Sequence, residues 1–376
     1  MANTEEGVAM GVTLSGDILK IAVFRALYLG DFICATPALR ALRRHFPSAE
    51  ITLIGLPWVQ EALRHNRIVD RFEPFPGFPG LHEAPFDPQR TWQFLERMQN
   101  AHLDLALQLH GDGRLSNSFV SMLGAKLSLG FSTNCDLDRR LTFTLPWVEE
   151  ENEVRRWSRL VRLLGAHSDE KVHFPFSPDD DRTAKSMLEE GPSRQGPLVG
   201  FHCGAKLPSR RWPIERFASL GNALADHTGA TIVLTGSAHE RALTAELREQ
   251  VRGPVIDLAG RTTLGTLGAV VARLDLLVTN DTGISHVAAA TRTPSVVLFG
   301  PSDPRRWAPL DKRRHRVVDA AARGQRSEYA LSNLAVDPVL EMVLQMLQTE
   351  DRANRAWIEA ASKQRVAVVE KPLCAG

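Results

Sequence analysis

The sequence predicts an α/β protein built from two doubly wound domains, and three observations carry this prediction. Short apolar runs rich in β-branched residues alternate with longer segments of helical periodicity over most of the 376 residues. The alternation breaks at a Pro- and Asp-rich stretch, Phe174–Asp181, and a fresh set of strand-like runs follows it. Strands that alternate with helices are typical of parallel sheets joined by right-handed crossovers.

The first half contains short apolar runs that we interpret as strands, at Ile21–Ala26, Ile51–Ile54 and Leu103–Leu109. A helix is expected over Pro37–Phe46, because Thr36 suits an N-cap and proline loses nothing at the first helical position. Arg71–Pro88 is rich in Pro, Phe and Gly, fits neither period, and is therefore expected to be a long surface loop.

The second half repeats the alternation with longer apolar runs. The expected strands are Leu198–His202, Thr231–Thr235, Leu274–Thr279 and Ser295–Phe299. The expected helices between them are Ile214–Asp226, Glu240–Gln250, Leu264–Arg273 and Ile284–Thr291. We therefore divide the chain into a flexible tail over 1–19, a first domain over 20–175, a linker region over 176–197 and a second domain over 198–330. Ligands of such folds bind at the carboxyl ends of the strands, here in the cleft between the domains.

The amino-acid composition argues against several classes of function. The 45 basic residues nearly balance the 44 acidic ones, which argues against a nucleic-acid partner. The four cysteines are scattered without a CxxC pair, so neither a zinc site nor a disulfide framework is indicated. The acidic start and the lack of a long uncharged apolar run favour a cytoplasmic protein.

Asp31 is the first candidate site residue, because it follows the first strand at the predicted mouth of the first domain. A carboxylate near a helix N-terminus stays ionised, which suits a general base. The alternative is that Asp31 merely caps the turn, and spacing alone favours this alternative.

The segment Val278–His286 is the second candidate, because a strand, a glycine turn and an Ala-rich helix follow one another there. Free amides at the start of that helix would bind an anion, and Gly283 would let a phosphate approach the backbone. Capping by Asp281 or Thr282, with His286 packed in the interior, is an equally plausible interpretation.

Two further strand-to-helix turns carry polar groups. The loop His202–Arg211 holds Ala205, Lys206 and two arginines, of which Arg210 is one; paired guanidinium donors suit a diphosphate, although a basic loop is usually a solvated face. The turn at Gly236 precedes Glu240, which could accept hydrogen bonds from a ribose or act as an ordinary first-turn helix acid.

No metal site is expected. Two Asp-x-Asp triplets occur, at Asp136–Asp138 and Asp179–Asp181, but neither follows an apolar strand directly. We interpret both as turn or linker acids. No P-loop, GxGxxG or GxSxG pattern accompanies them, so a nicotinamide cofactor is not indicated either.

Taken together and in this order, these segments resemble glycosyltransferase family 9, the ADP-heptose:lipopolysaccharide heptosyltransferase family. The most specific stretches are GDFICATPALRALR near the N-terminus and NDTGISHVAAA in the second half, and the resemblance runs from about Ile21 to Trp307. It implies a GT-B architecture, in which two Rossmann-like domains face a cleft, and an inverting, metal-independent transfer. It also implies that helices near the C-terminus, such as Val339–Leu347 within 331–376, pack back toward the first domain.

The resemblance also implies roles for the candidate residues. Asp31 matches the catalytic base, Glu240 matches the acid that contacts the ribose, and Arg210 stands where the family usually has a lysine that neutralises the leaving diphosphate. The remaining donor-side residues would be Ala205, Lys206, Gly236, Asp281, Thr282, Gly283 and His286. The chain departs from the family's His-Pro-Gly-Ala at Cys203. In the first domain, Arg114 and Asn117 match more loosely and would contact the acceptor.

The expected function is therefore transfer of a heptose, or a related sugar, from a nucleotide-diphosphate donor such as ADP-heptose to a hydroxyl of a lipopolysaccharide-core or other surface-glycan acceptor. No cofactor is expected, and a glycolipid acceptor would bring the enzyme to the cytoplasmic face of the inner membrane. The alternatives are a GT-B transferase or epimerase for another nucleotide sugar, and a non-catalytic nucleotide-sugar-binding subunit. An epimerase would convert the donor with no acceptor present.

Overall fold

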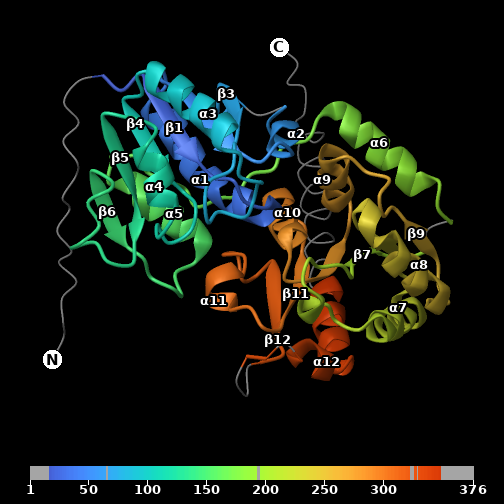
Figure 1. Ribbon diagram of the computed structural model, residues 1–376. Helices are drawn as coiled ribbons and strands as arrows, with labels where there is room; N and C mark the ends of the chain where they lie inside the picture. Colours follow the sequence, from blue (N-terminus) through green and yellow to red (C-terminus); the bar gives the residue numbers. More distant parts are fainter. Residues whose placement is uncertain (1–16, 65–66, 193–194, 322–325, 328, 349–376) are drawn as a thin grey trace, which may run out of the picture.

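The structure is a computed structural model that describes residues 17–64, 67–192, 195–321, 326–327 and 329–348. It contains two six-stranded sheets, each with all its strands parallel and with helices around it, which lie side by side in Figure 1. The strand orders are β3-β2-β1-β4-β5-β6 and β12-β11-β10-β7-β8-β9. Counted from the first strand of each sheet, these orders are the same, so the two domains are two copies of one doubly wound plan.

The first sheet has its central strands where the sequence predicts them. Its strands are β1 (Lys20–Phe24), β2 (Glu50–Gly55), β3 (Arg71–Pro74), β4 (Leu105–Gln108), β5 (Leu127–Ser132) and β6 (Phe143–Pro146). Its helices are α1 (Leu29–His45), α2 (Val59–Leu63), α3 (Pro88–Asn100), α4 (Ser116–Ser121) and α5 (Glu153–Arg162). The loop expected over 71–88 therefore begins with a short edge strand, β3, which pairs only with β2.

The second sheet contains the four predicted strands and two short edge strands, β9 and β12, that were not predicted. Its strands are β7 (Leu198–His202), β8 (Thr231–Leu234), β9 (Val255–Asp257), β10 (Leu276–Asn280), β11 (Ser295–Phe299) and β12 (His315–Asp319). Its helices are α6 (Pro178–Glu189), α7 (Ile214–Thr228), α8 (Arg241–Gln250), α9 (Leu264–Ala272), α10 (Gly283–Thr291), α11 (Pro304–Trp307) and α12 (Ala330–Asn333). Long apolar runs make these strands easy to recognise, because they are buried on both faces.

Helix α1 begins eight residues earlier than predicted, so Thr36 and Pro37 lie inside it rather than at its start. Proline cannot donate the hydrogen bond that the carbonyl of Ile33 would receive in a regular helix. The hydroxyl of Thr36 donates to that carbonyl instead, at 2.7 Å. This local repair lets the helix run through Pro37, and it places Asp31 in the first turn of a long helix rather than in a loop.

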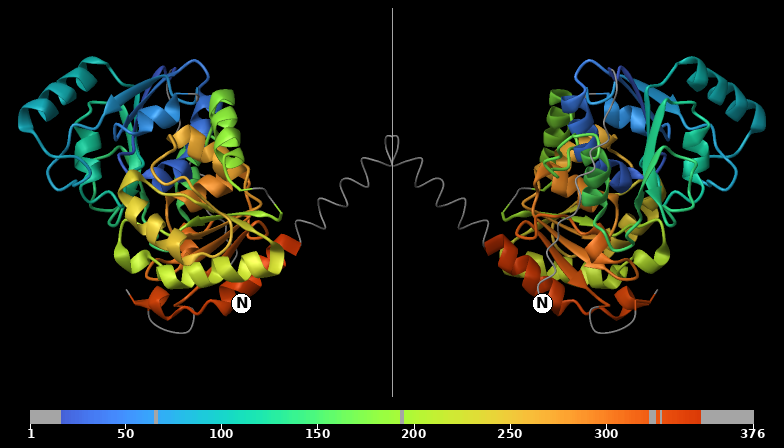
Figure 2. Two further views of the ribbon diagram at one scale, coloured as in Figure 1. Left: turned by 90° about the vertical axis from the view of Figure 1, so that its right-hand side faces the viewer. Right: turned by 90° about the vertical axis from the view of Figure 1, so that its left-hand side faces the viewer.

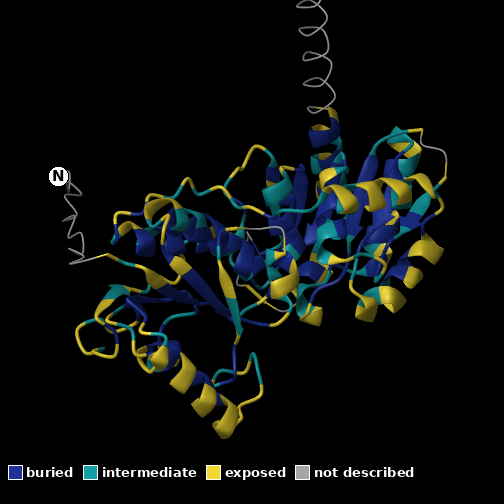
Figure 3. Cartoon of the chain, turned by 90° about the horizontal axis from the view of Figure 1, so that it is seen from above, coloured by how far each residue is buried: buried dark blue, intermediate teal, exposed yellow. Residues whose placement is uncertain are grey.

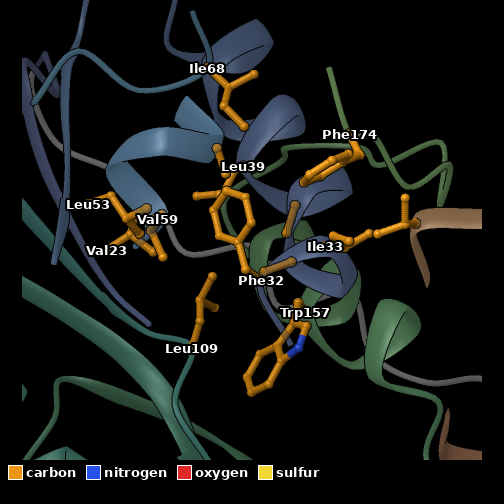
Figure 4. Close-up of a cluster of buried hydrophobic side chains, with 14 of the residues drawn as sticks. Val23, Phe32, Ile33, Leu39, Leu53, Val59, Ile68, Leu109, Trp157 and Phe174 are labelled. Carbon is orange, nitrogen blue, oxygen red and sulfur yellow. The ribbon is translucent and has the colours of Figure 1, made fainter. Parts of the chain in front are cut away.

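The two domains share a continuous apolar core. Phe32 and Ile33 of α1 belong to the same buried cluster as Ile284 and Val287 of α10 in the second domain. Figure 4 shows the first-domain part of this cluster, with Phe32, Leu39 and Trp157 among the labelled side chains. Figure 3 shows buried residues in both sheets and in the elements between them. We call this contact between α1 of the first domain and α10 of the second domain the seam. Burial of apolar surface there stabilises the contact between the domains.

Two segments, the linker region and the C-terminal helix, pack differently from the predicted domain division. Helix α6 begins at Pro178, within the Asp-rich stretch, because Ser177 and Asp180 form a reciprocal cap, and it packs on α9 of the second domain. The helix over 337–348 does not return to the first domain. Its Val339 and Val343 join the core of the second domain, and Figure 2 shows the C-terminal segment on that domain. Residues 1–16 and 349–376 lie outside the described residues.

Candidate active site

The starts of α1 and α10 meet where the two domains touch. A Cβ atom added to Gly283 would lie 3.1 Å from the backbone nitrogen of Gly30, and one added to Gly30 would lie 2.8 Å from Cδ2 of His286. Glycine at both positions therefore allows the two helix starts to approach each other closely. As a result, the turn with Asp31 and the turn with Asp281, far apart in sequence, lie on either side of one seam.

Asp31 is the third residue of α1, and its side chain is 18% exposed. The backbone amide of Tyr28, the N-cap residue, lowers the pKa of this carboxyl group. Asp31 therefore also favours the helix start electrostatically, as a capping residue would. The side chain nevertheless reaches solvent at the seam, which a purely capping role does not require.

Arg25 lies behind Asp31 and binds its backbone, a contact that was not predicted from the sequence. Its buried guanidinium donates from Nε and Nη2 to the backbone carbonyl of Asp31, at 3.0 and 2.7 Å, and Nη2 lies 3.5 Å from Oδ1. The guanidinium also stacks on Trp157, with Cζ 4.4 Å from the ring centroid. The available signal was a single arginine within the apolar run Ile21–Ala26.

The electrostatics of Asp31 suit a proton acceptor. Burial raises the pKa of the carboxyl group, Arg25 lowers it, and the nearby carboxylate of Glu153 raises it again, with a net shift upward. A carboxylate whose pKa lies above its ordinary value is a stronger base once it is ionised. The first domain therefore presents one strengthened base at the seam.

On the second domain, Asp281 is buried beside the start of α10. Oγ of Ser302 donates to its Oδ2 at 2.5 Å, and Nη1 of Arg210 lies 3.7 Å from the same oxygen. Burial raises the pKa of Asp281, while Ser302 and Arg210 oppose the shift. The N-cap residue Thr282 makes no side-chain cap, and its buried hydroxyl has no hydrogen-bond partner among the described residues. That hydroxyl and the first amides of α10 can therefore bind an anion.

The basic loop after β7 borders the same turn. The ammonium of Lys206 lies 4.0 Å from the ring centroid of Tyr28 in the first domain and donates to the hydroxyl of Tyr28. Nε of Arg211 donates to the carbonyl of Ala205 at 2.8 Å and so shapes the loop. Asn280, which the sequence analysis did not select, donates to the carbonyl of Cys203 at 2.9 Å and links this loop to the α10 turn. Lys206 is exposed but contacts Tyr28 across the seam, and Arg210 is half-buried beside Asp281.

Glu240 has the capping role that the alternative interpretation predicts. Its Oε2 accepts from the backbone amide and hydroxyl of Ser237, at 2.7 and 2.8 Å. Burial raises its pKa, but His202 and Ser237 outweigh that effect and the net shift is downward, so the carboxylate is ionised. A Cβ on Gly204 would lie 1.8 Å from Oε1, so glycine there makes room for it. A Cβ on Gly236 would approach Cβ of Glu240 to 3.3 Å, so this turn is also tight.

His286 is packed rather than open. It is buried, and its Nδ1 lies 3.4 Å from Sγ of Cys34 on α1. Burial is the main cause that lowers its pKa to about 4, so the ring is neutral near pH 7. A cavity of about 580 Å³ between the domains is lined in part by Cys34 and His286, but not by Asp31, Asp281 or Gly283. Of the candidate residues, only His286 lines that cavity.

The two acceptor-side candidates lie in different environments. Asn117 is fully buried, and its amide donates to Phe131 and to Asp138, each at 2.9 Å, so the structure gives it a packing role and not the open position expected of an acceptor ligand. Arg114 is 77% exposed and pairs with Asp112 at 2.6 Å. Its role in acceptor binding stays a prediction.

Acidic residues of both Asp-x-Asp triplets form ion pairs with nearby arginines. Asp138 pairs with Arg140 at 2.7 Å, and Asp181 pairs with Arg273 at 2.8 Å. Among the residues that the structure describes, no group of three or more His, Cys, Asp or Glu side chains could hold a metal ion. No described helix is long and apolar enough to cross a membrane.

Comparison with known proteins gives a consistent result. The model of the family described as glycosyltransferase family 9 (heptosyltransferase) matches residues 91–331. The lipopolysaccharide heptosyltransferase 2 of Escherichia coli K12 is 39% identical over 310 residues, which cover 78% of this chain and 86% of that protein. The lipooligosaccharide heptosyltransferase 2 of Haemophilus influenzae is 35% identical over 322 residues, with the same coverage.

Solved structures support the fold. The family 9 glycosyltransferase of Veillonella parvula has a TM-score of 0.74 at 22% identity, covering 89% of this chain and 99% of that one. The ADP-heptose lps heptosyltransferase II of E. coli has a TM-score of 0.70 at 24% identity, covering 89% and 100%. These likenesses, with the two matching sheets, confirm the expected GT-B fold.

Proposed function

The chain belongs to glycosyltransferase family 9, the heptosyltransferase family, and from that premise we propose that it moves a heptose from ADP-heptose to a hydroxyl of a lipopolysaccharide-core acceptor. We further propose that the transfer inverts the anomeric centre and uses no metal ion. The observation that carries this proposal is the carboxylate of Asp31, with its raised pKa, at the seam opposite the start of α10.

Asp31 acts as the general base in this proposal. It takes the proton from the acceptor hydroxyl as the acceptor oxygen forms its bond to the anomeric carbon. The bond between that carbon and the diphosphate oxygen breaks on the opposite face, and its electron pair leaves with the diphosphate. One direct displacement of this kind inverts the configuration. Positioned proton transfer of this type contributes roughly 10²–10⁴-fold to a rate.

The second domain stabilises the charge that develops on the leaving diphosphate. The first amides of α10 and the unpartnered hydroxyl of Thr282 supply neutral donors. Lys206 and Arg210 supply positive charge at the same seam. Preorganised donors and cations that face a developing negative charge can replace a metal ion. Glu240, ionised beside the turn at Gly236, would accept hydrogen bonds from the ribose through the oxygen that Ser237 leaves available.

A lipid-linked acceptor would bring the enzyme to the cytoplasmic face of the inner membrane. The supporting observation is the relationship to lipopolysaccharide heptosyltransferases, together with a first domain that leaves Arg114 exposed. Sedimentation with vesicles that contain the acceptor, compared with acceptor-free vesicles, tests this part of the proposal.

The decisive experiment incubates the enzyme with ADP-heptose and a lipopolysaccharide-core acceptor, with and without EDTA. Transfer unaffected by EDTA, and a product whose anomeric configuration by NMR is opposite to that of the donor, are the expected results. Retention of configuration would overturn the direct displacement, and strict dependence on Mg²⁺ would overturn the metal-free mechanism. Conversion of the donor without an acceptor would point to an epimerase, and no binding of ADP-, GDP- or UDP-sugars would point to a non-catalytic subunit.

A further inference from the structure

Glu153, the first residue of α5, is a carboxylate with only 3% of its side chain exposed. Three guanidinium groups surround it. Nη2 of Arg25 lies 3.7 Å from Oε2, Nε of Arg156 lies 3.3 Å from Oε1, and Nε of Arg306 lies 2.9 Å from Oε1. A buried carboxylate is retained only where its charge is compensated, and here three cations provide that compensation.

The three arginines connect different parts of the molecule. Arg25 follows β1 and contacts Asp31, whereas Arg156 lies one turn along α5, over the ring of Trp147. Arg306 belongs to α11 of the second domain, so its bond to Glu153 crosses the seam. Glu153 thus lies between the candidate base and the opposite domain.

The second-domain end of this network also reaches the donor side. Helix α11 follows directly on the segment that contains Ser302, the hydroxyl that donates to Asp281. A second contact, from Nδ2 of Asn152 to the carbonyl of Ala308 at 3.0 Å, fixes the same segment against the start of α5. Movement of the second domain away from the first would therefore break the bond between Arg306 and Glu153.

Glu153 acts on Asp31 through charge. Its carboxylate raises the pKa of Asp31, and Arg25, which lies between the two carboxylates, lowers it. The other groups that influence the pKa of Asp31 are the amide of Tyr28 and the ring of His110, both from the first domain, and Asp31 in turn raises the pKa of Asp281 in the second domain. The guanidinium of Arg306 partly neutralises the carboxylate of Glu153. When Arg306 is in contact, Glu153 should therefore repel the ionised form of Asp31 less strongly.

We propose that Glu153 is a positioning residue that shares Arg25 with the catalytic carboxylate of Asp31, and that Arg306 completes this arrangement when the two domains meet. The inference rests on the proposed function, because it assumes that Asp31 is the base. Its consequence is that closure of the domains favours the ionised base at the moment when the donor and acceptor are brought together.

The test is the pH profile of kcat/KM for transfer from ADP-heptose. Glu153→Gln removes the repelling charge, so the acid limb should move to lower pH, and the plateau rate should fall because a weaker base remains. Arg306→Gln leaves Glu153 less compensated, so the acid limb should move in the opposite direction. Arg306→Lys, which keeps the charge, should restore much of the wild-type position.

Glu149→Gln is the matched control. Glu149 also pairs with Arg306, at 2.7 Å, but it is 69% exposed and has no contact with Arg25. Its acid limb should therefore stay at the wild-type pH. The affinity for ADP, measured by calorimetry, should be unchanged in Glu153→Gln, because Glu153 lies in the first domain.

The outcomes separate this inference from the proposed function. If Asp31→Ala keeps normal turnover, the base assignment itself is wrong. If Asp31→Ala is inactive but the acid limbs of Glu153→Gln and Arg306→Gln stay in place, only the role of Glu153 is overturned. If Glu153→Gln does not fold, Arg306→Gln is the remaining test, because Arg306 is partly exposed and its replacement should be tolerated. An acid limb that stays at the wild-type pH in Arg306→Gln would overturn the inference.

Discussion

The two sides of the seam are built in opposite ways from the same strand-to-helix unit. On the first domain, one carboxylate, Asp31, is supported from behind by the buried guanidinium of Arg25. On the second domain, several hydrogen-bond donors and cations line the seam. They are the amides of α10, the hydroxyl of Thr282, and the side chains of Lys206 and Arg210. The proposed reaction explains the difference, because a proton needs one acceptor whereas the charge on a leaving diphosphate is spread over several oxygens.

This comparison predicts that single substitutions are far more damaging on the first side than on the second. Asp31→Ala should lower kcat by at least about 10²-fold, because it removes the proposed general base. Affinity for ADP should stay within a few-fold of wild type, since the proposed function places the nucleotide on the second domain. Turnover and calorimetric titration measure the two effects, and normal turnover in this variant would refute the assignment.

The close approach of the helix starts should give the next largest effect. Gly283→Ala places a Cβ 3.1 Å from the backbone nitrogen of Gly30, so α1 or α10 must shift. Overpacking of this kind costs about 1–3 kcal/mol, and it would also move Asp31 relative to α10. Both the melting temperature and kcat should fall. An unchanged kcat would show that the spacing of the two helix starts does not matter for transfer.

Loss of one cation on the second side should be milder. Arg210→Ala should reduce kcat/KM by about 10- to 100-fold, the range expected for one charge-assisted contact of about 1.5–3 kcal/mol. Arg210→Lys should recover most of that loss, because lysine keeps the positive charge. Equal losses in both variants would argue that the guanidinium geometry, rather than its charge, is required.

The smallest effects are expected from the acceptor-side pair, and they should differ in kind. Asn117→Ala should destabilise the protein by about 1–3 kcal/mol, because it removes two buried hydrogen bonds and leaves Asp138 without one partner. Arg114→Ala should change stability by less than about 0.5 kcal/mol, since the side chain is exposed. Chemical denaturation measures both. An effect of Arg114→Ala confined to KM for the acceptor would support its predicted role.

Sequence patterns located the strands of the second domain well, because buried parallel strands form continuous apolar runs. They placed the start of α1 wrongly, because Pro37 is a common first residue of helices and the hydroxyl of Thr36 that compensates for it cannot be recognised from spacing. The C-terminal helix was assigned to the wrong domain for a related reason. Its apolar face identifies a buried helix but not the surface that buries it.

By itself, the sequence determined the α/β class, the two-domain division, the family resemblance and the candidate residues, because these depend on local periodicity and on motifs that are contiguous in the chain. Only the tertiary structure decided which candidate residues lie at the seam and which are buried in the interior. Arg25, Glu153 and Arg306 are distant in sequence. Only the packing of the segment after β1 and of α11 against the start of α5 brings both guanidinium groups within 4 Å of the Glu153 carboxylate. Electrostatic coupling depends on the distance between charges and on their burial, and neither can be inferred from the order of the residues alone.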